Sequence, residues 1–250
     1  MSFGLGLGTA LIQSGGISSP LAISGNVLWN RADLGLHTAT GISQWDDQSG
    51  TGDANKNFVQ AVGGKQPTRN VADAAYNNQS TFSFASSGPQ FMVSGTWAVP
   101  PPVATGTWFL VGNQDGSASQ QAYLDGITAA LLRLDNNNAG LGASQLRFFL
   151  SAAGLVAGGL TNSHPSIIAV QSVAGSASSA LFVNALTAVA TGNPGTSAPT
   201  GVVVGANVSG LVPLNGKIAE LIAYNRILAA NEMALVFAYL STRYGITVGP

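Results

Sequence analysis

The residues that could carry acid–base chemistry are few in this chain. Its 250 residues include ten carboxylates, two histidines and no cysteine. Hydrolysis of a glycosidic bond needs two carboxylates that flank the bond, and acidic residues at alternate positions of a strand would provide them. The two glutamates, Glu220 and Glu232, lie in no such pattern, and the adjacent Asp46 and Asp47 would point to opposite faces of a strand. The sequence therefore predicts a protein that is not an enzyme.

Histidine and phosphate chemistry are equally poorly supported. His37 and His164 are isolated, and we interpret both as surface or hydrogen-bonded side chains. The glycines at positions 4, 6 and 8 have the spacing of a phosphate loop, but no strand precedes them and no helix follows.

Oxygen ligands for a hard cation are present in loop-like stretches. Asp115, Asp125 and the run Asp135–Asn138 offer the carboxylates and amides that Ca²⁺ prefers. Asp and Asn are also common in turns, because their side chains bond to nearby backbone groups. We expect no bound cofactor and leave calcium as an open alternative, with its ligands unassigned.

Carbohydrate binding would need accessible aromatic rings beside amide or carboxylate groups. Trp97, Trp108, Tyr123 and Tyr76 are candidates by residue type alone. Aromatic residues more commonly fill a core, and that interpretation is favoured here.

The amino-acid composition limits the kinds of partner that the protein is expected to bind. Charged residues make up 8% of the chain, against about 25% in typical domains. A net charge of −1 and abundant small polar residues predict a surface that repels neighbours weakly, as suits an assembled subunit; a secreted domain is the alternative. The nine Lys and Arg residues form no basic stripe, which argues against nucleic acid. No apolar run approaches the roughly 20 residues of a membrane span, and the start does not resemble a signal peptide.

Short β-type runs dominate the chain after a Gly/Ser-rich arm at residues 1–25. Their spacing, without helical periods between them, predicts one antiparallel sandwich over residues 26–250. The triple proline Pro100–Pro102 predicts an edge or a loop. The predicted strands are Val27–Arg31, Phe58–Val62, Ser80–Ala85, Thr107–Val111, Leu146–Leu150, Ser166–Val173, Ala180–Asn184, Gly201–Gly205 and Gly216–Asn225.

One helix is predicted near the end of the chain. Its apolar residues recur at i, i+3, i+4, i+7 and i+11, which gives one apolar face that we expect to cover the sandwich. Gly245 follows as a stop. A partner-binding amphipathic helix is the alternative. The face consists of Met233, Val236, Phe237, Leu240 and Tyr244.

Two parts of the chain resemble a known family. The opening part comprises Leu28–Gly35, LWNRADLG, and Trp45–Gly50, WDDQSG; the closing part comprises Leu214–Leu228, LNGKIAELIAYNRIL, and Tyr239–Ile246, YLSTRYGI. Both resemble the corresponding segments of concanavalin A-like, laminin-G-like domains of bacteriophage virion and bacterial surface proteins. The resemblance implies an all-β, antiparallel jelly-roll sandwich with one C-terminal helix. It implies little about function, since one fold serves many.

Residues of these motifs are assigned structural roles. Trp29 and Trp45 are expected in the core, and Asp47 belongs to the same opening motif. Glu220 should share a face with Ile218, Ile222 and Tyr224, so that its carboxylate is partly buried and needs a partner. We predict an ion pair between Arg31 and Glu220 that joins the two ends of the domain. Glu220 as a catalytic acid or calcium ligand is the alternative.

Two departures from the family pattern predict local differences. Ala229 stands where the family often has a hydroxyl residue as helix N-cap, although Glu232 keeps the capping-box position. Asn184 is followed by Ala185 rather than Gly, which predicts a longer loop than a two-residue hairpin turn.

These observations favour a non-catalytic bacteriophage virion protein, a decoration, head-fibre or tail-associated subunit. Its expected partners are other virion subunits, itself as a homo-oligomer, or a host-surface glycan. The N-terminal arm is expected to lie against another subunit. One alternative is a carbohydrate-binding module of a bacterial surface protein, extracellular or at the cell surface. A second is a polysaccharide-degrading enzyme.

Overall fold

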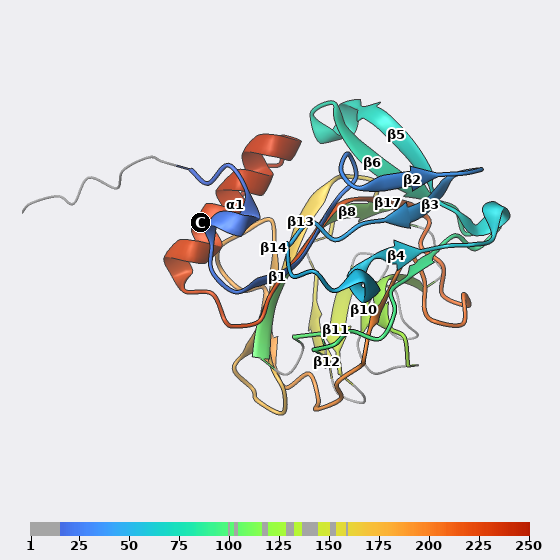
Figure 1. Ribbon diagram of the computed structural model, residues 1–250. Coiled ribbons are helices and arrows are strands. Elements are labelled where there is room, and N and C mark those ends of the chain that lie inside the picture. Colours follow the sequence, from blue (N-terminus) through green and yellow to red (C-terminus); the bar gives the residue numbers. More distant parts are fainter. Residues whose placement is uncertain are drawn as a thin grey trace, which may run out of the picture.

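Two antiparallel β-sheets and one α-helix dominate the part of the protein that its computed structural model describes (Figure 1). The structure describes residues 16–99, 101–102, 105–116, 120–128, 133–136, 145–150, 154–158 and 160–250. Among these residues, no helix is long and apolar enough to cross a membrane. The observed architecture is the predicted all-β sandwich with one C-terminal helix.

The sheet next to the helix, here called the inner sheet, is built around one long central strand, β17. β8 pairs with one edge of β17, while β6 and β1 share the other edge. In spatial order the inner sheet contains β15 (Ala190–Gly192), β14 (Ser179–Val183), β13 (Ser166–Val173), β8 (Thr105–Gln114), β17 (Gly216–Tyr224), β6 (Gln79–Phe84) and β5 (Thr68–Asp73), with β1 (Asn26–Arg31) continuing the edge of β17 beyond β6.

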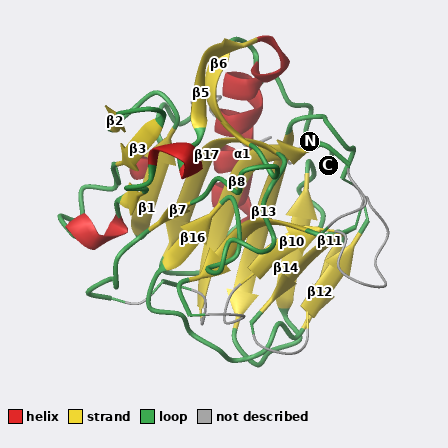
Figure 2. Ribbon diagram, turned by 90° about the vertical axis from the view of Figure 1, so that its right-hand side faces the viewer, coloured by secondary structure: helices red, strands yellow, loops and turns green. Residues whose placement is uncertain are grey.

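The second sheet, here called the outer sheet, consists mainly of short strands (Figure 2). In order it contains β12 (Gly154–Ala157), β11 (Leu146–Phe149), β10 (Arg133–Asn136), β9 (Gln121–Gly126), β16 (Val202–Val204), β7 (Met92–Val93), β4 (Phe58–Val59), β3 (Ile42–Trp45) and β2 (Leu36–Thr38).

Every predicted strand overlaps an observed one, and Ser166–Val173 has the predicted bounds. The missed strands are mostly short ones, such as β2 and β7, which carry too few residues to show an alternating pattern. Pro101 and Pro102 lie in the connection before β8, as predicted, and Pro100 lies outside the described residues. The longer loop after Asn184 is confirmed, since β14 ends at Val183 and β15 begins at Ala190.

The inner sheet is buried on both faces, which explains its long apolar strands. On β13, Ile168 and Val170 pack between the sheets, whereas Ile167 and Ala169 pack on the helix side. A strand covered on both faces shows a continuous apolar run instead of alternation. The molecule therefore has two apolar layers, one between the sheets and one between the inner sheet and the helix.

The helix α1 (Ala230–Tyr244) covers the inner sheet with the predicted face. All five predicted apolar residues are buried, among them Val236 and Leu240, each 0% exposed. Gly245 ends the helix in the left-handed conformation at φ 67°, where a side chain would be strained. The alternative of a helix free to bind a partner is therefore wrong for this face.

The first turn of α1 is held by a carboxylate in place of a hydroxyl cap. Glu232 accepts a hydrogen bond from the Ala229 N–H at 2.9 Å and pairs with both terminal nitrogens of Arg226 at 2.6 and 2.7 Å. The hydrogen bonds from Arg226 and the Ala229 N–H hold the pKa of Glu232 down at about 2. Half of a capping box is thus present, and the N-cap side chain contributes nothing.

Part of the predicted N-terminal arm packs on the domain. Pro20 and Ile23 are buried, Tyr224 donates to the Pro20 carbonyl at 3.0 Å, and Ile17 packs on the helix-side layer. Pro20 opens a short 3₁₀ turn, η1 (Pro20–Ala22). Residues 1–15 of the arm lie outside the described residues.

Restoring the missing cap should stabilise the protein. Ser at position 229 would accept a hydrogen bond from the first turn of α1, so Ala229→Ser should raise unfolding stability by about 1 kcal/mol. Chemical denaturation measures the change. Ala230→Ser, one residue later and also exposed, is the control and should bring no gain. Equal stability of Ala229→Ser and the parent would contradict the role assigned to this cap.

Candidate binding site

Glu220 is the most deeply placed charged residue of the closing motif. It is 1% exposed and lies between the inner sheet and α1. Its carboxylate accepts hydrogen bonds from the Trp29 indole at 2.6 Å, the Tyr244 hydroxyl at 2.7 Å and the Tyr239 hydroxyl at 3.0 Å. These donors come from β1 and from α1, so one carboxylate ties three elements together.

The predicted ion pair between Arg31 and Glu220 is corrected. The two residues do face each other across β1 and β17, as expected. Arg31 pairs instead with Asp33 at 2.6 Å, and the cation nearest to Glu220 is Arg243, at 4.0 Å. Tyr239 lies between the predicted partners, accepting from Arg31 at 3.5 Å while it donates to Glu220. The helix thus supplies a phenol that the strand pattern could not reveal.

The face assigned to Glu220 also needs correction at one residue. β17 carries a bulge between Ile218 and Glu220, so that Ala219 and Glu220 both lie on the helix side. Ile218 points into the layer between the sheets, while Ile222 and Tyr224 share the helix side with Glu220 as predicted. An extra residue in a strand reverses the alternation beyond it.

Burial dominates the electrostatics of this cluster. Desolvation raises the pKa of Glu220, and the three hydrogen bonds and Arg243 lower it only in part. Desolvation and the nearby Glu220 charge also raise the pKa of Tyr244 well above its usual range. The cluster is a structural network in which one indole and two phenol groups donate to one carboxylate.

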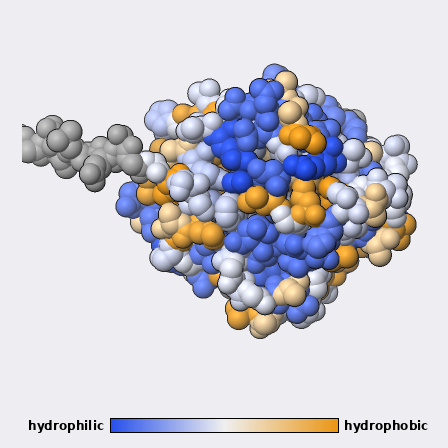
Figure 3. Space-filling view, turned by 45° about the horizontal axis from the view of Figure 1, so that its top comes forward, coloured by the Kyte–Doolittle hydropathy of each residue, from blue (hydrophilic) through white to orange (hydrophobic). Residues whose placement is uncertain are grey.

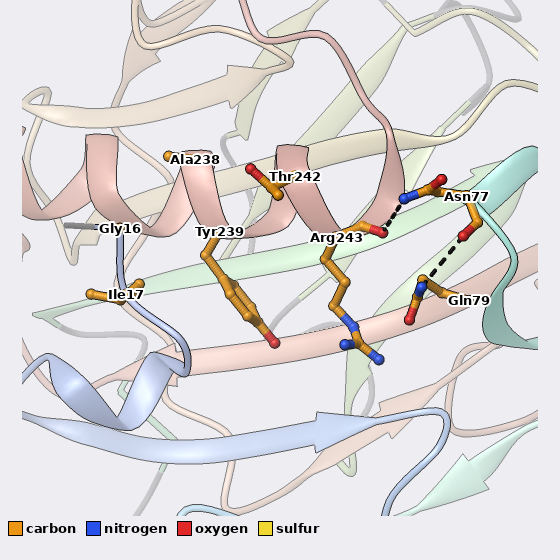
Figure 4. A pocket seen from close by; sticks show the side chains of 8 residues that line it. All are labelled: Gly16, Ile17, Asn77, Gln79, Ala238, Tyr239, Thr242 and Arg243. Carbon is orange, nitrogen blue, oxygen red and sulfur yellow. Dashed lines mark hydrogen bonds between the residues drawn. The ribbon is translucent and has the colours of Figure 1, made fainter. Parts of the chain in front are cut away.

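A cavity of about 400 Å³ lies on the outer side of this network. Figure 4 shows Tyr239 and Arg243 extending from α1 along its wall, with Ile17 opposite. Arg243 donates to Asp33 at 2.9 Å, and Tyr239 is bonded to Glu220. Because these polar groups are engaged in the network, we interpret this cavity as its outer boundary.

The two other motif residues act around the opening strand. Trp45 is 0% exposed, packs edge-on against Phe82 at 4.8 Å and donates to the Arg31 carbonyl at 3.0 Å. Asp47 accepts from the Trp29 N–H at 2.9 Å and from the Ser49 N–H at 3.0 Å. Asp47 therefore fastens the loop that follows the opening motif to β1.

That loop forms one wall of a second cavity, here called the Trp97 pocket. Asp53 starts a 3₁₀ turn, η2 (Ala54–Lys56), by accepting from the Asn55 N–H at 3.1 Å. Its other oxygen accepts from the Ala98 N–H at 2.8 Å, which joins the loop to the segment containing Trp97. Asn225, at the end of β17, completes the polar lining.

The Trp97 pocket has a volume of about 230 Å³ and a largely apolar wall. The Trp97 ring stacks on Trp108 at 6.4 Å, and its indole N–H donates to Ser94 at 2.9 Å, which fix its orientation. The pocket is lined by Val27, Thr51, Asp53, Lys56, Trp97, Ala98, Val99, Pro102 and Asn225.

Lys56 supplies a buried positive charge in this pocket. Its ammonium donates to the Val27 carbonyl at 2.8 Å and to the Thr51 hydroxyl at 3.0 Å, and lies 5.4 Å from the centre of the Trp97 ring. Desolvation lowers the pKa of Lys56, and the charges of Asp47 and Asp53 oppose that effect. The pocket therefore combines an aromatic ring, a carboxylate, an ammonium and an amide.

Only one of the four aromatic candidates lines this pocket. Trp97 does so although it is itself 3% exposed; Tyr76 and Tyr123 are 0% exposed and Trp108 is 4% exposed, so all four rings are largely packed in the core, as the sequence favoured. Sequence reasoning missed Asp53, Lys56 and Asn225. No sequence pattern showed that the stretch after the opening motif meets a segment 45 residues later.

The carboxylates considered for calcium have other partners. Asp125 pairs with Arg133 at 2.9 Å and Asp135 with Arg147 at 2.8 Å. Asp115 accepts from Gln121 at 2.7 Å. Residues 137 and 138 of the predicted ligand run lie outside the described residues. Within the described ranges, no group of three His, Asp or Glu side chains is placed to hold a metal ion.

No family model and no curated protein matches the chain. Several solved structures do match the chain. Trypanosoma rangeli sialidase in complex with the inhibitor DANA aligns with a TM-score of 0.58 at 15% identity, over 89% of this chain and 35% of that one. The ligand binding domain of botulinum neurotoxin serotype D, in complex with N-acetylneuraminic acid, aligns with a TM-score of 0.60 at 11% identity, over 88% of this chain and 52% of that one.

These likenesses show the fold. The chain has a concanavalin A-like sandwich fold. It spans a third to a half of the length of these solved chains, and its identity to them is too low to transfer a site. The surface agrees with the composition: Figure 3 shows hydrophilic residues over much of one face, with hydrophobic residues in small separate groups.

Removing one donor from Glu220 should destabilise the protein in a pH-dependent way. The Tyr244 hydroxyl stabilises the ionised carboxylate, so Tyr244→Phe should raise the pKa of Glu220 further. A group with a raised folded pKa costs stability as the pH rises above its unfolded value. We expect a loss of about 1–3 kcal/mol at neutral pH and a smaller loss below pH 4.5.

Urea titrations at several pH values measure this dependence. Tyr76→Phe is the control, since the Tyr76 hydroxyl is also buried but donates to Asn113 at 3.0 Å. The decrease in unfolding free energy caused by Tyr76→Phe should be the same at every pH in this range. A pH-independent loss in Tyr244→Phe would contradict the proposed charge on Glu220.

Proposed function

We propose that this chain is a non-catalytic, carbohydrate-binding sandwich and that the Trp97 pocket receives the sugar. The observation that carries the proposal is the convergence of an oriented indole, the Asp53 carboxylate and the Asn225 amide in one small cavity. Sugars combine apolar C–H faces with hydroxyl groups, and such a lining suits both. Structural neighbours that were solved with sialic acid or N-acetylneuraminic acid lend support through the shared fold.

The bonding of the carboxylates supports the absence of catalysis. General acid–base catalysis needs a carboxylate that can reach a substrate proton. Five of the ten carboxylates accept from an arginine or lysine, and the described lining of the Trp97 pocket contains one carboxylate, Asp53, where glycoside hydrolysis uses two. In particular Glu220, the acid candidate of the closing motif, is enclosed by three donors.

We further propose that the protein is a bacteriophage virion component, made in the host cytoplasm, in which the sandwich contacts a host-surface glycan or neighbouring subunits. The resemblance of its opening and closing motifs to virion domains supports this location, together with its low content of charged residues. A carbohydrate-binding module at a bacterial surface would use the same pocket, and location distinguishes the two.

Blocking the Trp97 pocket should abolish glycan binding. Val99 lines the pocket and is 73% exposed, so Val99→Arg should obstruct the cavity without disturbing the core. Asn225→Ala should remove one polar contact and weaken binding about tenfold. Glycan arrays followed by calorimetry measure both. Val71→Arg, equally exposed at 69% but on β5, is the matched control.

Two further results would contradict the proposal. Equal glycan binding by Val99→Arg and Val71→Arg would exclude this pocket. Release of oligosaccharide from polysaccharides, lost on substitution of Asp46, Asp47 or Glu220, would contradict the absence of catalysis.

The location is tested separately. Antibodies against the chain should label purified phage particles and detect it in their protein complement. Detection in a bacterial surface fraction without particles would support the surface module instead.

A further inference from the structure

We infer that the Trp97 pocket selects a neutral N-acetylhexosamine over both acidic sugars and plain hexoses. This inference rests on the proposed function and specifies the sugar class for the same pocket. It depends on the charges around Lys56 and on how polar and apolar groups are divided in the lining.

The charge balance disfavours an anionic ligand. Lys56 is the cation of the lining, and two of its three ammonium protons are used by Val27 and Thr51. The negative charges of Asp47 and Asp53 both attract the Lys56 ammonium and favour its charged form. Asp47 also accepts from the Thr51 hydroxyl at 3.3 Å, which connects it to the ammonium through one side chain. A sugar carboxylate would thus meet the negative charge of Asp53 in the lining and one positive charge that is already bonded, with the Asp47 charge acting on that cation from outside the lining.

The lining also offers binding partners for an acetamido group on the sugar. Asp53 accepts one hydrogen bond at each oxygen, from Asn55 and Ala98, and an ionised carboxylate can accept about four. An amide N–H of the ligand is therefore a suitable further donor. Beside Asp53 the wall is apolar, with Ala98, Val99 and Pro102, which suits the acetamido methyl. A plain hexose would leave this wall without a partner.

Size and orientation agree with a single ring. The volume of about 230 Å³ is small; the Trp97 indole lines it but is only 3% exposed, so the accessible apolar surface comes from Ala98 and Val99. The remaining ammonium proton of Lys56 and the Asn225 amide are then available to sugar hydroxyls. No ion or water is required by this arrangement.

Calorimetry or ligand-observed NMR with defined monosaccharides tests the inference on the full chain. The probes are N-acetylglucosamine and N-acetylgalactosamine, compared with glucose, galactose and N-acetylneuraminic acid. The last probe carries an acetamido group and a carboxylate but is also a larger, nine-carbon sugar, so the effect of charge is measured by the Asp53→Asn comparison below. At least one N-acetylhexosamine should bind about tenfold or more tightly than its parent hexose and than N-acetylneuraminic acid.

Asp53→Asn should reduce the preference over N-acetylneuraminic acid, because it removes one negative charge and keeps an amide oxygen for the loop. Asp46→Asn is its control, since Asp46 lies in the same loop but bonds to His37 and Gln44 outside the pocket. Thermal unfolding verifies that both variants fold.

The outcomes distinguish a failure of the inferred sugar preference from a failure of carbohydrate binding itself. Tightest binding of a plain hexose or of N-acetylneuraminic acid, lost in Val99→Arg, would overturn this inference and leave the proposed function intact. Equal preferences in Asp53→Asn and Asp46→Asn would also overturn it. Failure of every glycan to bind would overturn the proposed function and this inference together.

Discussion

The carboxylate of Glu220 must be satisfied in a layer without access to water, and the arrangement of the chain ends follows from that requirement. An unpaired buried charge costs several kcal/mol, so the surrounding elements have to bring donors to it. β1 brings the Trp29 indole, and α1 brings two phenols. The position of α1 on the inner sheet is thereby fixed along its axis as well as by its apolar face. A helix shifted by one turn would lose both phenols.

A bulge in β17 makes this arrangement possible. Without the extra residue at Ala219, the alternation that places Ile218 between the sheets would place Glu220 there too. That layer is largely apolar, and the three donors that satisfy Glu220 lie on the other face of the sheet. The bulge instead directs Glu220 toward the helix, so a local irregularity decides which of two apolar layers receives the charge.

The opening motif has a comparable effect at the other end of the molecule. Asp47 fastens its loop to β1, and Asp53 joins the same loop to the Trp97 segment. A rigid loop, a stacked tryptophan pair and the end of β17 therefore meet in fixed positions, which leaves a small cavity with directed polar groups. Binding sites are commonly formed by loops that a rigid scaffold holds in place.

The sequence by itself determined the fold class, most of the longer strands and the helix with its buried face, because these depend on apolar periodicity and local stop residues; the six-residue strands β5 and β9 were missed. It also indicated that Glu220 is buried and that β1 and β17 adjoin. Only the tertiary structure decided the partner of Glu220, since the donors lie on a helix whose position along the sheet is not encoded locally. It likewise decided the pocket, because Asp53, Trp97 and Asn225 are brought together by sheet topology across much of the chain. Short strands and a single-residue bulge escaped prediction for the same reason: they depend on pairing with distant strands, and a few residues carry no period of their own.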